Sequence, residues 1–148
     1  IPQIYAGTEI ALSSTEDHGE LRKDFPGGWK DDKVNVFDDI GLSSLQMETK
    51  SFVKSLLNWR RSNKAVAYGK LIHYPVTNGI YVYFRTYQKD KLMVIMNNKE
   101  NKEMLNLDLY RETFENKNYG VDIISGKTYN LLEELIVNPK TALILDLK

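Results

Sequence analysis

The sequence predicts a mainly β chain whose C-terminal part is an antiparallel β-sandwich. After Lys64 apolar residues alternate with polar ones at a period of two, which is typical of half-buried strands. About seven short runs of this kind follow one another, with frequent turns and no long helix between them. The preceding sequence instead has a long polar loop and one helical pattern. We therefore expect two parts, residues 1–64 and residues 65–148, with a boundary near 64–69.

The first part begins with a short apolar run and then a loop. Residues 4–10 are expected to form a short buried strand that Gly7 breaks. From Ala11 to Leu42 the sequence has almost no periodicity, and loops of this length inside a compact domain are usually functional or disordered. The loop carries three aromatic residues that a disordered linker would rarely have, namely Phe25, Trp29 and Phe37.

One helix is expected at about 44–62. Ser43 and Gln46 have the spacing of a capping box, in which each side chain bonds a free backbone N–H of the first turn. The apolar residues recur at helical spacing, as Leu45, Phe52, Leu56 and Trp59 show. Arg60 and Arg61 suit the negative end of the helix dipole, and Asn63 is a suitable terminator.

The second part is expected to consist of short strands. Residues 71–74 and 80–84 should form a hairpin, because Asn78-Gly79 is a strong signal for a tight turn. Further strands are expected at 92–96, 105–110, 121–125, 135–137 and 142–147.

Composition excludes several classes of function. Lys plus Arg is 20 and Asp plus Glu is 20, so the chain lacks the excess of cations that binding to nucleic acid requires. No apolar run is long enough to span a membrane. Without cysteine there is no disulfide, thiolate ligand or cysteine nucleophile. His18 and His73 lie far apart in the sequence, so neither a zinc site nor a Ser-His-Asp triad is expected.

The long loop carries the residues that could bind a substrate or take part in catalysis. Paired carboxylates serve glycoside hydrolysis, and an aromatic face can stack on a sugar ring. Acidic residues in such a loop are nevertheless more often simply solvated. The segment 25–29 (FPGGW) can fold tightly because of its two glycines, and it is equally a ligand platform or a structural plug. The loop carboxylates are Glu9, Glu16, Asp17, Glu20 and Asp24, and the candidate substrate-binding residues are Arg22, Asp24 and Trp29.

Two further features of the sequence are the tyrosines of the strands and the aspartates of the loop. The strands are rich in tyrosine, which usually indicates half-buried packing and less often a carbohydrate-binding face. Asp17, Asp31 and Asp32 do not form an EF-hand pattern, so no metal site is expected.

The chain resembles the C-terminal part of the α-amylase family of glycoside hydrolases. Residues 1–9 (IPQIYAGTE) resemble the stretch around the last strand of the family's catalytic (β/α)8 barrel. Residues 22–29 (RKDFPGGW), followed by Asp32, Asn35 and Phe37, resemble a loop of its cyclomaltodextrinase and neopullulanase branch. Residues 56–61 (LLNWRR) resemble its last barrel helix. Ala6 departs from the pattern, since these enzymes usually carry a second Tyr there.

The resemblance implies a fold and an activity. The fold would be the last strand, loop and helix of a barrel, in residues 1–64, followed by a C-terminal sandwich. Since the chain opens at Ile1 with neither an initiator Met nor a signal peptide, we expect a longer parent protein. The parent would cleave α-glucosidic bonds in cyclodextrins, pullulan or maltooligosaccharides with retention of configuration.

The catalytic carboxylates would lie upstream, so no catalytic residue is assigned to this chain and it is expected to be inactive alone. The resemblance also allows calcium in the parent, a bacterial periplasmic or cytoplasmic location, and a homo-oligomer formed through the exposed barrel remnant. Two alternatives remain open, an α-glucan-binding module without catalysis and a small enzyme that uses the loop carboxylates.

Overall fold

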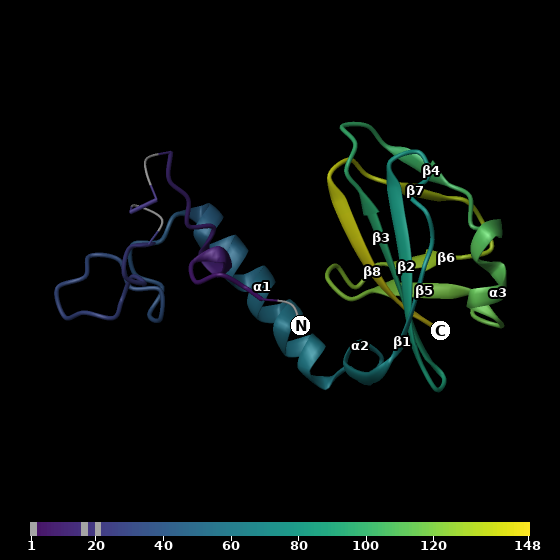
Figure 1. Cartoon of the computed structure of the whole chain (residues 1–148), viewed down its shortest axis with the longest axis horizontal. Helices are drawn as coiled ribbons and strands as arrows, with labels where there is room; N and C mark the ends of the chain where they lie inside the picture. Colours follow the sequence, from purple (N-terminus) through teal and green to yellow (C-terminus); the bar gives the residue numbers. More distant parts are fainter. Residues whose placement is uncertain (1–2, 16–17, 20–21) are drawn as a thin grey trace. The chain divides into compact units, whose positions relative to one another are not determined.

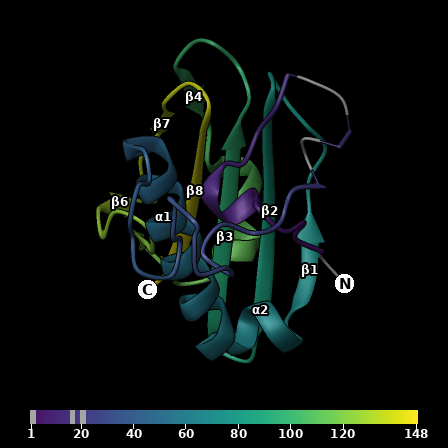
Figure 2. The ribbon, with the colours of Figure 1, turned by 90° about the vertical axis from the view of Figure 1, so that its left-hand side faces the viewer.

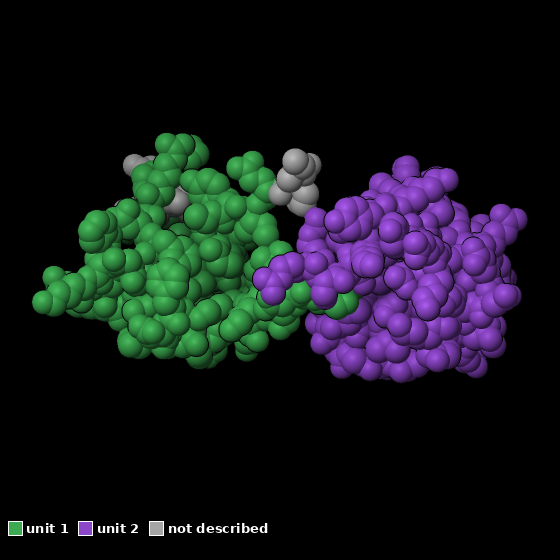
Figure 3. All heavy atoms as spheres, turned by 90° about the horizontal axis from the view of Figure 1, so that it is seen from below, with its two compact units in different colours: residues 1–59 green, residues 60–148 purple. Residues whose placement is uncertain are grey.

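The computed structural model describes residues 3–15, 18–19 and 22–148. The chain forms two compact units, Ile1–Trp59 and Arg60–Lys148 (Figure 3). Three of the loop carboxylates considered above, Glu16, Asp17 and Glu20, lie outside the described residues.

The strand expected at residues 4–10 is wrong. This segment instead contains a short 3-10 helix, η1 (Thr8–Ile10). Gly7 has a φ of 95° and Ala11 a φ of 49°, both in the left-handed region, so the backbone cannot stay extended. The Gly7 carbonyl accepts hydrogen bonds from the N–H groups of Ile10 (3.2 Å) and Leu12 (2.9 Å), which close a turn. Ile10 becomes fully buried while Ile4 stays half exposed.

The helix expected at 44–62 is confirmed as α1 (Ser44–Ser62), labelled in Figure 1. The capping box is also confirmed, since the Ser43 N–H donates to Gln46 Oε1 (2.9 Å) and the Gln46 N–H donates to Ser43 Oγ (3.3 Å). Asn63 follows the helix, and its side chain caps the next one, α2 (Lys64–Tyr68). No residue of α1 is buried, and Phe52 on its apolar stripe is 46% exposed.

The second unit is built from two antiparallel sheets. The larger sheet has six strands in the order β1-β2-β3-β8-β5-β6, and the smaller one pairs β4 with β7; Figure 2 shows β1, β2, β3 and β8 side by side. The strands are β1 (Lys70–His73), β2 (Ile80–Tyr87), β3 (Asp90–Asn97), β4 (Glu103–Leu105), β5 (Tyr119–Asp122), β6 (Thr128–Asn130), β7 (Leu135–Val137) and β8 (Thr141–Leu147).

The hairpin between β1 and β2 turns where the sequence predicts. Asn78 has a φ of 51° and Gly79 a φ of 76°, the two positive angles of a tight turn whose twist matches the strands. The β1 and β2 register pairs His73 with Tyr83.

The strand expected at 105–110 is wrong beyond its first residue. β4 ends at Leu105, because the Asn106 side chain accepts the Asp108 N–H (2.8 Å) and bends the backbone. The chain continues as the 3-10 helix η3 (Asp108–Tyr110) and the short helix α3 (Arg111–Phe114). β6, a short and polar strand, has no counterpart in the expectations.

The two sheets share one hydrophobic core, which confirms the mainly β, sandwich-like fold. Val82, Phe84 and Ile95 from the large sheet are fully buried together with Val137 from the small one. Four aromatic rings pack edge to face or tilted within this core, at centroid distances of 4.7–6.5 Å: Tyr74, Phe84, Tyr110 and Phe114. Within the described parts of the chain, no helix has the length and apolar character needed for a transmembrane span.

Candidate functional site

The structure brings two of the three candidate substrate-binding residues together. The Trp29 indole Nε1–H donates to Asp24 Oδ2 at 3.1 Å, and the Trp29 side chain is 68% exposed. Arg22 is exposed as well, and its backbone N–H donates to the Gly19 carbonyl (3.1 Å). Among the described residues, no hydrogen bond joins the Arg22 side chain to Asp24 or Trp29.

A tight turn carries Trp29. Gly27 has a φ of 104°, which strongly favours glycine. A Cβ at this position would lie 2.5 Å from Asn35 Oδ1, so space as well as conformation selects glycine. Asp32 Oδ2 accepts the backbone N–H groups of Gly27 (2.7 Å) and Trp29 (3.1 Å), and the Asp32 N–H donates back to the Trp29 carbonyl (3.2 Å). The turn is therefore fixed by its own polar groups.

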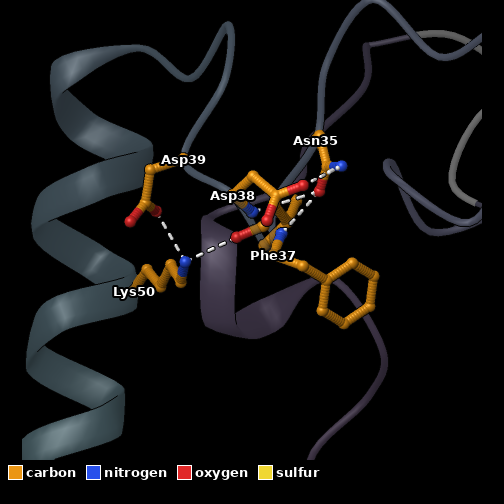
Figure 4. A network of polar contacts seen from close by, with 6 residues as sticks. Asn35, Phe37, Asp38, Asp39 and Lys50 are labelled. Carbon is orange, nitrogen blue, oxygen red and sulfur yellow. Dashed lines mark hydrogen bonds and ion pairs between the residues drawn. The ribbon is translucent and has the colours of Figure 1, made fainter.

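Asn35 organises the next turn (Figure 4). Its Oδ1 accepts the N–H groups of Phe37 (2.9 Å) and Asp38 (3.2 Å), and its Nδ2 donates to Asp38 Oδ2 (2.8 Å). Its backbone also exchanges two hydrogen bonds with Ile40, at 2.9 and 3.0 Å. This turn adjoins the first, because the Val36 N–H donates to the Pro26 carbonyl (3.2 Å).

Lys50 joins this turn to helix α1. Its ammonium group donates to the Val36 carbonyl and forms an ion pair with Asp39 (Figure 4). Val36 is itself buried, at 4% exposure, and the rings of Phe25 and Phe37 lie 5.8 Å apart. The segment 24–40 is thus an ordered platform with a tether to the helix, and Trp29 protrudes from it.

Three of the described carboxylates in this part of the chain accept hydrogen bonds from their own turns. Glu9 Oε2 accepts the Gly7 N–H at 2.8 Å, Asp24 holds the indole, and Asp38 holds the Asn35 amide. Within the described ranges, no group of three or more His, Asp or Glu side chains could hold a metal ion. The chemistry that this arrangement offers is an exposed aromatic face with polar groups beside it.

Sequence reasoning placed Asp32 and Asn35 in the loop that carries the family resemblance, but it did not select them as residues of this site. The available signal was local: Asp and Asn in a Gly/Pro-rich loop tend to accept backbone N–H groups a few residues away. Asp32 does so at Gly27 and Trp29, but its partners depend on the folded turn.

Solved structures of amylases share this fold. The chain is similar to AmyP, in a complex with maltotriose, with 17% identity and a TM-score of 0.65 over 74% of this chain and 22% of that one. It is similar to an Anoxybacillus α-amylase, with 22% identity and a TM-score of 0.64 over 97% of this chain and 28% of that one. An α-amylase from Geobacillus thermoleovorans, complexed with acarbose, gives 17% identity and a TM-score of 0.58 over 74% and 24%.

The chain corresponds to only part of each of these proteins. The chain spans roughly a quarter of each of these longer proteins, between 22% and 28% of their length. The resemblance to the α-amylase family is confirmed by a family match that covers residues 71–146, from β1 to β8. The chain belongs to the family of cyclomaltodextrinase C-terminal domains.

Proposed function

We propose that this chain is the C-terminal segment of a glycoside hydrolase that cleaves α-glucosidic bonds in cyclodextrins, pullulan or maltooligosaccharides. The observation that carries this proposal is the family match over residues 71–146, since that family is named for the C-terminal domain of cyclomaltodextrinase. The likeness to the Anoxybacillus α-amylase extends the support, because it takes in 97% of the chain and hence the loop and helix before the sandwich.

The proposal divides the chain at the start of α2. Residues 1–64 would complete a catalytic (β/α)8 barrel, and residues 65–148 would form the sandwich that follows it. The segment alone would be inactive, and four of its described carboxylates, Glu9, Asp24, Asp32 and Asp38, bond groups of their own turns. Retaining hydrolysis instead needs a nucleophile and an acid that face each other across a substrate.

Capture of the native protein tests this proposal. An antibody raised against the 148-residue chain would be used to isolate its antigen from source cells. We expect the captured protein to release reducing sugar from maltooligosaccharide, cyclodextrin or pullulan, and the purified 148-residue chain to release none. Captured protein without activity on any of these α-glucans would contradict the proposal.

Within the parent, we propose that Trp29, Asp24 and Arg22 contact the α-glucan. The support is the exposed indole, whose face is available while its edge is held by Asp24. Aromatic faces of this kind suit the apolar faces of pyranose rings, and the carboxylate and guanidinium can bond sugar hydroxyls. Arg22 has weaker support than Trp29, because no described contact joins its side chain to this pair.

The second candidate function is an α-glucan-binding module that works without catalysis. The same exposed indole favours it, and fluorescence separates it from the first. If the 148-residue chain binds maltooligosaccharide by itself, Trp29 emission should change on titration and Trp59→Phe should leave that change intact. The binding module would be favoured if the 148-residue chain binds maltooligosaccharide and the captured native protein hydrolyses none of these α-glucans.

The apolar stripe of α1 calls for a covering surface. On this stripe Leu45 is 64% exposed and Phe52 46%, and no residue of the helix is buried. In the parent we propose that the rest of the barrel covers this stripe. Without the barrel a second copy would do so, and sedimentation of the 148-residue chain should then show a dimer that Phe52→Glu dissociates.

A further inference from the structure

We propose that Asp32 is a positioning residue that holds the Trp29 side chain exposed for an α-glucan. The inference rests on the proposed function in one respect, that Trp29 contacts the glucan. The sequence analysis named Asp32 as part of the loop that carries the family resemblance, but not as a binding residue. Its role follows from the hydrogen bonds of the turn that carries Trp29.

The contacts place one carboxylate oxygen at the centre of the turn. Asp32 Oδ2 lies 2.7 Å from the Gly27 nitrogen and 3.1 Å from the Trp29 nitrogen. The Asp32 N–H donates to the Trp29 carbonyl at 3.2 Å, so the backbone of Trp29 is held by both its N–H and its C=O. Hydrogen bonds that end on an ionised acceptor are stronger than neutral ones.

The side chain of Trp29 is held separately from its backbone. Its Nε1–H donates to Asp24 Oδ2 at 3.1 Å, which fixes the edge of the indole. With backbone and edge both fixed, the exposed ring has little freedom to turn aside. A binding group that is already in place loses less conformational entropy when a ligand arrives, and affinity rises accordingly.

The turn is anchored to the helix on its other side. Asn35 fills the space that a Cβ at Gly27 would need, and the Val36 N–H donates to the Pro26 carbonyl at 3.2 Å. The Lys50 ammonium group holds the Val36 carbonyl and Asp39 (Figure 4). Asp32 thus acts on a short turn whose far end is fixed, so its removal should loosen Trp29 more than the rest of the loop.

Other roles for Asp32 fit the geometry less well. A general acid or base needs a carboxyl oxygen turned toward substrate, whereas Asp32 Oδ2 already accepts two backbone N–H groups. A cation site of carboxylates needs several of them to converge, and within the described residues no group of three or more His, Asp or Glu side chains could hold a metal ion. Positioning is the role that uses the contacts present.

The test compares three variants in a Trp59→Phe background, where Trp29 is the only reporter. Asp32→Ala removes the acceptor, and Asp32→Asn keeps an oxygen that can accept the same N–H groups without the charge. Asp31→Ala is the matched control, because Asp31 is an exposed neighbour of equal charge outside this set of bonds. The readouts are acrylamide quenching of Trp29, its fluorescence anisotropy, and the Kd for maltoheptaose.

We expect Asp32→Ala to lower the anisotropy of Trp29 and to raise the Kd by about fivefold, in line with the loss of a preorganised contact. The Kd of Asp32→Asn should stay within about twofold of the Kd of the Trp59→Phe chain. The Kd of Asp31→Ala should equal that of the Trp59→Phe chain. Far-UV circular dichroism that is unchanged among the variants would confirm that helix α1 and the sandwich remain folded.

The measurements distinguish a failure of the positioning role of Asp32 from a failure of the glucan contact of Trp29. If Asp32→Ala leaves both the anisotropy and the Kd as they are, Asp32 does not position Trp29. If Trp29→Ala binds maltoheptaose as tightly as the Trp59→Phe chain does, or if that chain does not bind it, Trp29 does not contact a glucan in this segment. In that second case the anisotropy and quenching of Asp32→Ala still decide whether the carboxylate holds the ring.

Discussion

Replacement of Asn97 by Ala should destabilise the sandwich more than any surface change at the same end of the fold. Asn97 ends β3 and is 2% exposed. Its Nδ2 donates to the carbonyls of Asn101 (3.0 Å), Val137 (3.2 Å) and Asn138 (2.9 Å), and its Oδ1 accepts the Lys99 N–H (3.0 Å). One amide therefore joins the turn after β3 to the segment after β7.

The magnitude follows from how well water can replace each bond. The bond to Val137 is buried, and a buried acceptor left without a partner costs about 1–3 kcal/mol. The bonds to Lys99, Asn101 and Asn138 are partly exposed, so each contributes at the lower end of about 0.5–1.5 kcal/mol. We expect a total loss of about 3 kcal/mol, and at about 4–8 °C per kcal/mol for a unit of this size the Tm should fall by about 12–24 °C.

Guanidinium unfolding followed by far-UV circular dichroism measures this loss. Asn101→Ala is the control, because Asn101 contributes only its backbone carbonyl and that group survives the substitution. The free energy of unfolding of Asn101→Ala should stay within about 0.5 kcal/mol of the value for the unsubstituted chain. Equal midpoints for Asn97→Ala and Asn101→Ala would refute the argument that the buried amide holds the two segments together.

Three further predictions concern other parts of the fold. Gly120→Ala should cost about 1–3 kcal/mol, because the added Cβ would lie 2.9 Å from the Leu145 Cβ; a Tm equal to that of the parent would count against this packing. Ser43→Ala should cost about 1 kcal/mol through loss of the cap of α1, with Ser44→Ala as control; equal helix content in the two variants on heating would count against it. Burial, and then the nearby Tyr74, raises the pKa of Tyr110 above 10.0. The native state therefore keeps a proton that the unfolded state releases, so the free energy of unfolding should fall as pH rises above about 10, and less steeply in Tyr110→Phe.

The sequence predicted the parts of the fold that depend on neighbours in the chain. Ser43 and Gln46 lie three residues apart and cap α1 as the spacing indicates. The hairpin at Asn78 and Gly79 follows from two residues that adopt positive φ easily. In both cases the relevant groups are local, so the pattern contains the information.

Features that depend on tertiary contacts or on competing local bonds escaped prediction. The alternation around Leu105 predicted a strand to residue 110, but one Asn106 hydrogen bond turned the chain into η3. The apolar residues before Ile10 predicted a strand, yet Gly7 and Ala11 adopt left-handed angles that close a turn. Asp32 was missed in the candidate site because its two N–H partners converge only in the folded turn.

The size of the native protein tests the central claim most directly. An immunoblot of source cells, with an antibody against the 148-residue chain, measures it without any assumption about substrate. The account predicts a protein longer than this 17.1 kDa chain by at least the ~250 residues of a (β/α)8 barrel. A single band at 17.1 kDa would contradict it, and the α-glucan-binding module would then be the better account.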